Sequence, residues 1–174
     1  MLDGAAHAAV SPRGGGSLQF QRVVMVDRRL DDVFDYISDF TTTAEWDPGT
    51  VTTVRREGDG GVGTRYLNMR RFGGRTVVLD YTVTDCVANH VFALHGRTPS
   101  LDALVRFTVR EATVGPHRLW TRLTFTGDYQ FRGRSRLARP ILASSLEQVC
   151  DAGQHGLEQA LLARPRSTDI RRVS

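Results

Sequence analysis

Apolar residues recur every three or four positions between residues 28 and 40, which is the spacing of a helix with one buried face. The stripe consists of Leu30, Val33, Phe34, Ile37 and Phe40. Asp27 precedes it as a candidate N-cap. A second helical turn can follow in residues 41–46, and Pro48 ends it because proline holds the preceding residue in extended geometry. The pattern therefore predicts a helix and a short second helical turn.

The segments on either side of these helices alternate between apolar and polar residues, as β-strands do. One strand is expected at residues 18–27, before the helices. The segments expected after them are residues 50–57, 63–72, 75–86, 90–97, 101–112 and 117–131, and most of the connections contain Gly or Pro. Because consecutive strands joined by short turns pair in antiparallel fashion, we expect an antiparallel meander of seven strands.

One face of this sheet is expected to be apolar and the other polar. The apolar side of three segments carries Val77, Leu79, Tyr81 and Val83, then Ala103, Val105, Phe107 and Val109, then Leu119, Leu123, Phe125, Tyr129 and Phe131. The segment 63–72 is ambiguous, because two sets of residues compete for the inner face. We place Leu67 and Met69 inside; in the alternative, Tyr66 and Arg70 face a cavity and could bind or polarise a carbonyl oxygen.

The helical spacing returns after Ser135 and predicts a long helix over the apolar face of the sheet. Its stripe consists of Leu137, Ile141, Leu142, Leu146, Val149, Cys150, Leu157 and Leu161. Pro140 should bend or restart this helix near its beginning. Gly153 and Gly156 each cost a helix roughly 1 kcal/mol relative to alanine, and we interpret them as positions of close packing.

The length suits one domain, which we expect at residues 18–163. Residues 1–17 are rich in Ala, Gly and Ser and are expected to form a flexible arm, and residues 164–174 a basic flexible tail. No apolar run is long enough to span a membrane and no secretory signal is seen, so we expect a cytoplasmic protein.

All 23 basic residues are arginine, and the absence of lysine excludes two kinds of chemistry. A Walker phosphate loop needs its lysine, and Schiff-base or pyridoxal chemistry needs an amine nucleophile. The net charge is +4, but the arginines are interspersed with 19 acidic residues along most of the chain, so we expect no nucleic-acid partner.

The remaining chemistry-bearing residues form no recognised catalytic or metal motif. Cys86 and Cys150 have no metal-ligand spacing and are expected to be buried thiols, so we expect no metal and no cofactor. His90 and His95 could transfer protons near a cavity edge, but five residues along a strand separate them onto opposite faces.

The order of these elements and several short motifs resemble a known family. The motifs are Val33, Tyr36, Ile37 and Asp39 in the first helix, Trp46-Asp47-Pro48, GVGTRY, YTVTD, and the closing RPILASSLEQVCDAGQHGLEQALL. Over about residues 18–163 the chain resembles the SRPBCC superfamily of START-related proteins, and within it the polyketide cyclase/dehydrase family. The resemblance implies an α+β helix-grip (START-like) fold, in which a strongly bent seven-stranded antiparallel sheet wraps a long C-terminal helix.

The resemblance also implies a deep hydrophobic pocket between sheet and helix, with its entrance near the short helices. The candidate ligand-binding residues are Trp46, Leu67, Met69, Leu79, Tyr81, Phe92, Leu94, Phe107, Phe125, Tyr129, Leu142 and Leu146. Tyr81 and Tyr129 are the polar groups in this set, since a buried phenol normally finds a hydrogen-bond partner. A fully packed core would give the same pattern, so each residue can instead have a purely structural role.

Three functions remain open at this level. The first is binding or carriage of a hydrophobic small molecule of the lipid, polyketide or isoprenoid type. The second is a polyketide cyclase or dehydratase that works without metal or nucleotide cofactor, for which no catalytic residue can be assigned. The third is a protein-interaction module, motivated by Trp120 on the polar face and by the arginine-rich tail, with a homodimer as one candidate assembly.

Overall fold

The computed structural model describes residues 8–13, 17–72, 74–115, 118–133 and 139–165. Its strands form one antiparallel sheet with the order β1-β2-β8-β7-β6-β5-β4-β3. The strands are β1 Ala8–Arg13, β2 Ser17–Val26, β3 Thr50–Glu57, β4 Arg65–Phe72, β5 Arg75–Val87, β6 Val91–Thr98, β7 Leu101–Val114 and β8 Arg118–Phe131. The helices are α1 Leu30–Ser38, η1 Phe40–Thr42, α2 Thr43–Trp46 and α3 Arg139–Ala163.

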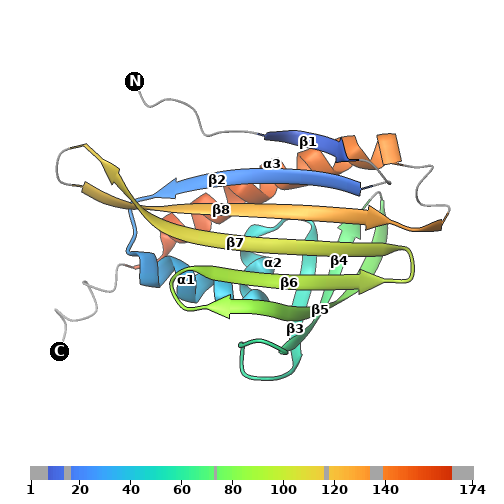
Figure 1. The fold of residues 1–174 in the computed structure, drawn as a ribbon, viewed down its shortest axis with the longest axis horizontal. Helices are drawn as coiled ribbons and strands as arrows, with labels where there is room; N and C mark the ends of the chain where they lie inside the picture. Colours follow the sequence, from blue (N-terminus) through green and yellow to red (C-terminus); the bar gives the residue numbers. More distant parts are fainter. Residues whose placement is uncertain (1–7, 14–16, 73, 116–117, 134–138, 166–174) are drawn as a thin grey trace.

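The sheet curves around the helices, all of which lie on its inner face (Figure 1). The view is from the outer face, with α3 behind β2 and β8, and with α1 and α2 behind the strands that follow. This arrangement confirms the predicted architecture of a bent antiparallel sheet, two short helices after its first core strand, and a long C-terminal helix. Among the described residues, no helix has the length and apolar character of a membrane span.

The sheet has one strand more than predicted, because residues 8–13 of the expected flexible arm form β1. This strand pairs with β2 at the edge of the sheet, with Arg13 opposite Ser17. The arm prediction followed from small residues without apolar periodicity, and an edge strand does not need such a pattern because backbone hydrogen bonds hold it. Residues 1–7 of the arm and 166–174 of the predicted tail lie outside the described part of the chain.

The first helix begins at Leu30, so the prediction of Asp27 as its N-cap is wrong. Arg29 occupies that position, and its side chain makes no capping hydrogen bond. Residues 27–29 form the connection from β2, which places Asp27 too far upstream to cap the helix. Arg29 instead forms an ion pair with Asp31 at 2.7 Å.

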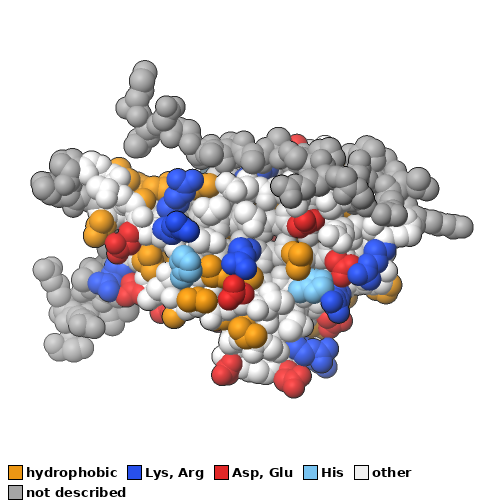
Figure 2. Space-filling view, in the orientation of Figure 1, with side chains coloured by type: hydrophobic (Ala, Val, Ile, Leu, Met, Phe, Trp, Pro, Cys, Tyr) orange, Lys and Arg blue, Asp and Glu red, His pale blue; other side chains and the backbone are white. Residues whose placement is uncertain are grey.

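Outside β4, the two faces of the sheet divide largely as their alternation predicts, although Leu119, expected on the apolar face, is 64% exposed. The described side chains Leu79, Tyr81, Phe107, Leu123 and Phe125 are buried under the helices. On the outer face, charged side chains and histidines are interspersed with single apolar ones (Figure 2). Val78 and Leu104, on strands that also carry core residues, are 43% and 47% exposed there. The core therefore lies on one side of the sheet.

Ion pairs and hydrogen bonds attach α3 to the rest of the domain at several points. Arg22, buried in β2, forms an ion pair with Asp151 of α3 at 2.8 Å. At the C-terminal end of α3, Nε of Arg28 donates a hydrogen bond to the carbonyl of Leu161 at 3.1 Å. Such cations at a helix C-terminus also interact favourably with the helix dipole.

Close packing explains one of the two glycines of α3. A Cβ atom at Gly156 would overlap the carbonyl oxygen of Trp46, so only glycine lets the end of α2 lie against α3. A Cβ atom at Gly153 would lie 3.7 Å from the Trp46 indole, an ordinary contact. An added methyl group would therefore clash with α2 at Gly156 but would fit at Gly153.

We expect Gly156→Ala to lower the free energy of unfolding by about 1–3 kcal/mol, because α2 and α3 must separate to admit the methyl group. Gly153→Ala is the matched control, and we expect it to be neutral or to stabilise by up to about 1 kcal/mol through helix propensity. Urea denaturation of the full chain measures both. Equal effects of the two substitutions would contradict the close approach at Gly156.

Candidate functional site

A cavity of about 50 Å³ lies between the inner face of the sheet, α2 and α3. It is the candidate site because apolar and polar side chains from distant segments converge there. One wall is aromatic: the rings of Trp46 and Phe107 are 6.2 Å apart, and those of Phe107 and Phe125 are 5.8 Å apart and stacked. A polar cavity needs roughly 10–15 Å³ of accessible space to hold a water molecule, so this cavity has room for water.

The opposite end of the cavity holds a buried ion pair. A terminal nitrogen of Arg70, in β4, lies 3.2 Å from Oδ2 of Asp47, and the two side chains are 12% and 11% exposed. Asp47 follows α2 directly, where the chain turns into β3. Its Oδ1 accepts a hydrogen bond from the N–H of Gly49, and its Oδ2 accepts one from the hydroxyl of Thr50, both at 2.9 Å. The break after α2 thus positions the carboxylate.

Asn68 extends this polar end along β4. Its Nδ2 donates to the hydroxyl oxygens of Thr53 at 2.7 Å and Thr50 at 3.2 Å. Thr53 also shares a hydrogen bond of 2.6 Å with Thr43 of α2. A chain of buried hydrogen bonds therefore joins β4, β3 and α2 and fixes the direction of the asparagine side chain.

Three polar atoms on residues that line the cavity are buried and have no hydrogen-bond partner among the described residues. They are Nε1 of Trp46, Oδ1 of Asn68 and Nε of Arg70. Buried polar groups in proteins are normally hydrogen-bonded, so each such atom calls for a partner supplied by water or ligand. The first and third are donors and the second is an acceptor.

Burial and neighbouring groups shift the pKa values of four residues that line the cavity. Burial acts to lower the pKa of Arg70, but the Asp47 charge and the neighbouring Tyr129 and Tyr81 more than offset it, so the pKa is raised. Burial raises the pKa of Tyr81. Burial also raises the pKa of Tyr129, and the neighbouring Tyr81 adds to this effect. Burial also raises the pKa of the Cys150 thiol to about 12. The arginine therefore stays charged while the phenols and the thiol stay neutral.

The structure brings about half of the predicted ligand-binding residues to this cavity. Those that line it are Trp46, Tyr81, Phe107, Phe125, Tyr129 and Leu146. Leu79, Phe92 and Leu94 are buried in the same apolar core but do not line the cavity. The side chain of Leu142 lies outside the described part of the structure.

The placement of Leu67 and Met69 on the inner face is wrong, and the alternative orientation of this strand is correct. Tyr66 and Asn68 are 1% and 2% exposed, and Arg70 lines the cavity. Asn68 and Arg70 can face inward because β3 and the residue that follows α2 supply their partners.

The length of the hairpin connection could have revealed this orientation. Phe72 of β4 pairs with Arg75 of β5, which places Asn68 opposite Leu79 and Tyr66 opposite Tyr81. Directly opposed residues share a face of the sheet, and Leu79 and Tyr81 were already assigned to the inner face.

Several lining residues were absent from the sequence prediction. They are Phe20, Phe40, Thr43, Asp47, Thr50, Asn68, Val105, Val149, Cys150 and Gly153. Val105 and Cys150 belonged to the predicted apolar faces, so their burial was foreseeable. Asp47 gave no such signal, because a charged residue before proline is typical of an exposed turn.

Neither candidate histidine lies at the cavity. His90 ends the turn before β6 and is exposed. His95 is on the outer face of β6, where its Nε2 lies 3.1 Å from Oδ1 of Asp102. Asp102 also forms ion pairs with Arg97 and Arg132, which accounts for a buried carboxylate on the polar side of the sheet. Among the described residues, no group of His, Cys, Asp and Glu could hold a metal ion.

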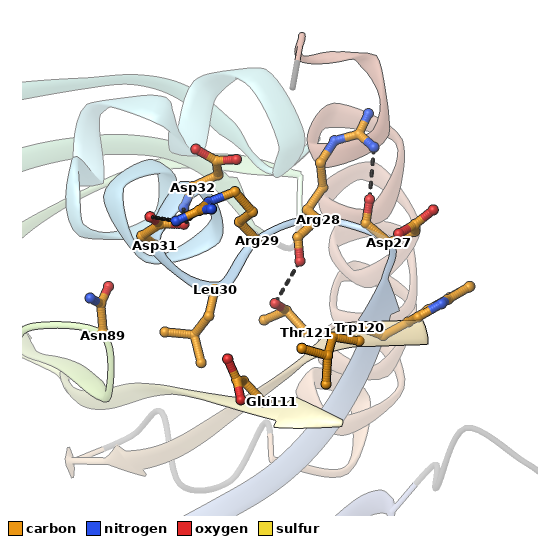
Figure 3. Close-up of a pocket in the computed structure, with 11 residues that line it drawn as sticks. Asp27, Arg28, Arg29, Leu30, Asp31, Asp32, Asn89, Glu111, Trp120 and Thr121 are labelled. Carbon is orange, nitrogen blue, oxygen red and sulfur yellow. Dashed lines mark hydrogen bonds and ion pairs between the residues drawn. The ribbon is translucent and has the colours of Figure 1, made fainter. Parts of the chain in front are cut away.

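A larger cleft, of about 510 Å³, lies between the start of α1 and the β7–β8 hairpin (Figure 3). Glu111 and Leu30 line it, and Trp120 lies at its edge. Several of its polar groups are already paired: Arg29 binds Asp31, and the Thr121 hydroxyl donates to the carbonyl of Arg28 at 2.8 Å. We therefore take the smaller cavity, which has unpartnered polar atoms, as the functional site.

Comparison with known proteins adds a family and a set of related folds. The family described as "Polyketide cyclase / dehydrase and lipid transport" matches residues 17–161. Among proteins with curated descriptions, none matches the sequence.

Solved structures with the same fold share little sequence identity with the chain. The Zhui aromatase/cyclase from Streptomyces sp. R1128 is 16% identical, with a TM-score of 0.72, and the match covers 87% of this chain and 98% of that one. A START superfamily protein from Mycobacterium smegmatis is 15% identical, with a TM-score of 0.64 and coverage of 82% and 96%. The di-domain aromatase/cyclase BexL of the BE-7585A pathway is 17% identical, with a TM-score of 0.67 and coverage of 87% and 52%.

Proposed function

This chain belongs to the polyketide cyclase/dehydrase and lipid transport family, and we propose that it binds an apolar small molecule in the cavity between the sheet and α3. The observation that carries the proposal is the combination of an aromatic wall with three buried polar atoms that lack partners. Ligand sites in proteins typically combine mostly apolar walls with a few directed polar groups. The ligand class is a lipid, polyketide or isoprenoid, with its polar end at Arg70.

The cavity must expand to hold such a ligand. Its volume of about 50 Å³ is well below the roughly 300–1,000 Å³ of typical ligand sites. Helix α3 contributes Leu146, Val149 and Cys150 to the cavity, so a shift of this helix away from the sheet enlarges it. Binding in this proposal therefore moves α3 and leaves the hydrogen-bonded end formed by β3, β4 and α2 in place.

Titration with an uncharged apolar fluorescent probe such as Nile red, together with native mass spectrometry, tests the proposal. We expect Leu146→Trp to weaken probe binding at least about tenfold, because a larger side chain fills the cavity. The matched control is Val78→Trp, at a position 43% exposed on the outer face. Equal binding by both variants, or no binding by the wild-type protein, would refute the proposal.

A second candidate function is a cofactor-independent cyclase or dehydratase, and one observation favours it. Arg70 is a buried cation beside Tyr81 and can orient a carbonyl group and stabilise charge that develops on its oxygen. The discriminating experiment is incubation of a poly-β-ketone analogue with and without protein. A cyclised or dehydrated product formed only with protein supports the enzyme, whereas tight binding without turnover supports the carrier.

A further inference from the structure

The charges at the polar end of the cavity cancel. Of the described residues that line it, Arg70 and Asp47 are the charged ones, and they form the 3.2 Å ion pair. Asp47 also accepts hydrogen bonds from Gly49 and Thr50, so its carboxylate is held in place without a ligand. Arg22, a further buried arginine, is paired with Asp151 at 2.8 Å. Within the described part of the chain, the cavity therefore offers no uncompensated positive charge to an anionic ligand.

A carboxylate ligand would therefore be disfavoured at this end. It would lose its hydration on entering the cavity and would lie beside the carboxylate of Asp47, which repels it. The carbonyl oxygen of an uncharged ligand has neither cost and needs only hydrogen-bond donors. The N–H groups at Nε of Arg70 and Nε1 of Trp46 are such donors, and both are buried without a partner among the described residues.

The third unpartnered atom adds a requirement. Oδ1 of Asn68 is an acceptor, and its direction is fixed because Nδ2 of the same side chain is bonded to Thr53 and Thr50. A ligand that satisfies all three atoms needs an oxygen that accepts and a hydroxyl that donates. Neutral hydroxy ketones, enolised diketones and phenolic ketones have both groups.

Building on the proposed function, we propose that this cavity selects an uncharged ligand carrying a carbonyl beside a hydroxyl, and that Asp47 sets the selectivity by neutralising Arg70. The carbonyl accepts hydrogen bonds from Arg70 and Trp46, and the hydroxyl donates to Asn68. Ligands with the same carbon skeleton but a charged carboxylate in place of the ketone are rejected.

Two fluorescent ligands of nearly identical shape test this selectivity. Ortho-acetylnaphthol carries the neutral hydroxyl and ketone, and ortho-hydroxynaphthoate replaces its methyl group by a charged oxygen. For the wild-type chain at neutral pH we expect the ketone to bind at least about tenfold more tightly than the acid. In Asp47→Asn, which keeps the shape but leaves Arg70 without its counter-charge, we expect the acid to gain at least about tenfold.

Two further variants separate a local charge effect from other causes. Asp47→Asn combined with Arg70→Gln again has an uncharged polar end, and we expect the gain for the acid to disappear. Asp85→Asn removes an exposed partner of Arg106 and should leave both affinities unchanged. If Asp47→Asn does not fold, the wild-type comparison still tests the preference for the uncharged ligand.

The outcomes distinguish the two proposals. If neither naphthyl ligand nor the apolar probe binds the wild-type chain, the proposed function fails. If the ligands bind but the acid binds as tightly as the ketone, the selectivity proposal is overturned while the binding function stands. If Asp47→Asn leaves the preference for the ketone unchanged, Asp47 does not set it.

Discussion

Asp47→Ala should lower the free energy of unfolding by about 3–5 kcal/mol, the range found when one partner of a buried ion pair is removed. The substitution leaves the Arg70 guanidinium, which keeps its proton in proteins, without its counter-charge in a site where the side chain is only 12% exposed. It also removes the acceptor for the N–H of Gly49 and the hydroxyl of Thr50. Urea denaturation followed by tryptophan fluorescence measures the loss.

Two control variants test whether the loss of stability comes from leaving a buried charge unpaired. Arg70→Met should cost less than Asp47→Ala, because Asp47 retains its hydrogen bonds from Gly49 and Thr50. Asp85→Ala, which breaks an exposed ion pair with Arg106, should cost no more than about 1 kcal/mol. An effect of Asp47→Ala as small as that of Asp85→Ala would show that Arg70 is solvated and not buried.

Phe107→Ala should cost about 3–5 kcal/mol as well, because it removes a fully buried ring that contacts Trp46, Phe92 and Phe125. Because Phe107 lines the cavity, the truncation also enlarges it. A small apolar ligand such as benzene should then raise the melting temperature of this variant more than that of the wild-type chain.

The control for this substitution lies on the same strand. Leu104 is 47% exposed on the outer face of β7, so Leu104→Ala should change stability by less than about 0.5 kcal/mol. Differential scanning fluorimetry with and without benzene compares the variants. If Phe107→Ala is stable but benzene does not change its melting temperature, the surrounding side chains have collapsed into the space left by the ring.

The sequence was informative wherever periodicity and burial agree. The stripe of α1 contains Val33, Phe34 and Ile37, all of which are buried, and the alternation in β5 placed Leu79 and Tyr81 correctly. In these segments one face is apolar and the other polar, so the sequence has only one favourable orientation. The order of strands and helices followed from the same patterns and from short connections.

The polar end of the site could not be read in the same way. In β4, hydrophobicity favoured Leu67 and Met69 over Asn68 and Arg70, because a lone strand does not show which partners its polar residues will meet. The partners come from the short helix and from β3: Thr43, Asp47, Thr50 and Thr53. Their positions depend on how α2 lies between the sheet and α3, where Gly156 allows its close approach. This is a tertiary relation that no local pattern encodes.

The pairing of β2 with β8 has a consequence for how the chain acquires its structure. Gln19 and Asp128, which are hydrogen-bonded across these strands, are 109 residues apart, and Arg28 binds a carbonyl of α3 133 residues further on. Because loop closure over such separations must precede the stabilising contacts, folding is expected on the millisecond-to-second scale and not in microseconds. During synthesis β2 emerges early and has no partner on its inner edge until β8 is complete. Until α3 follows β8, the apolar face on which the ligand site is later built stays partly uncovered, and this is the stage at which the chain is most exposed to aggregation.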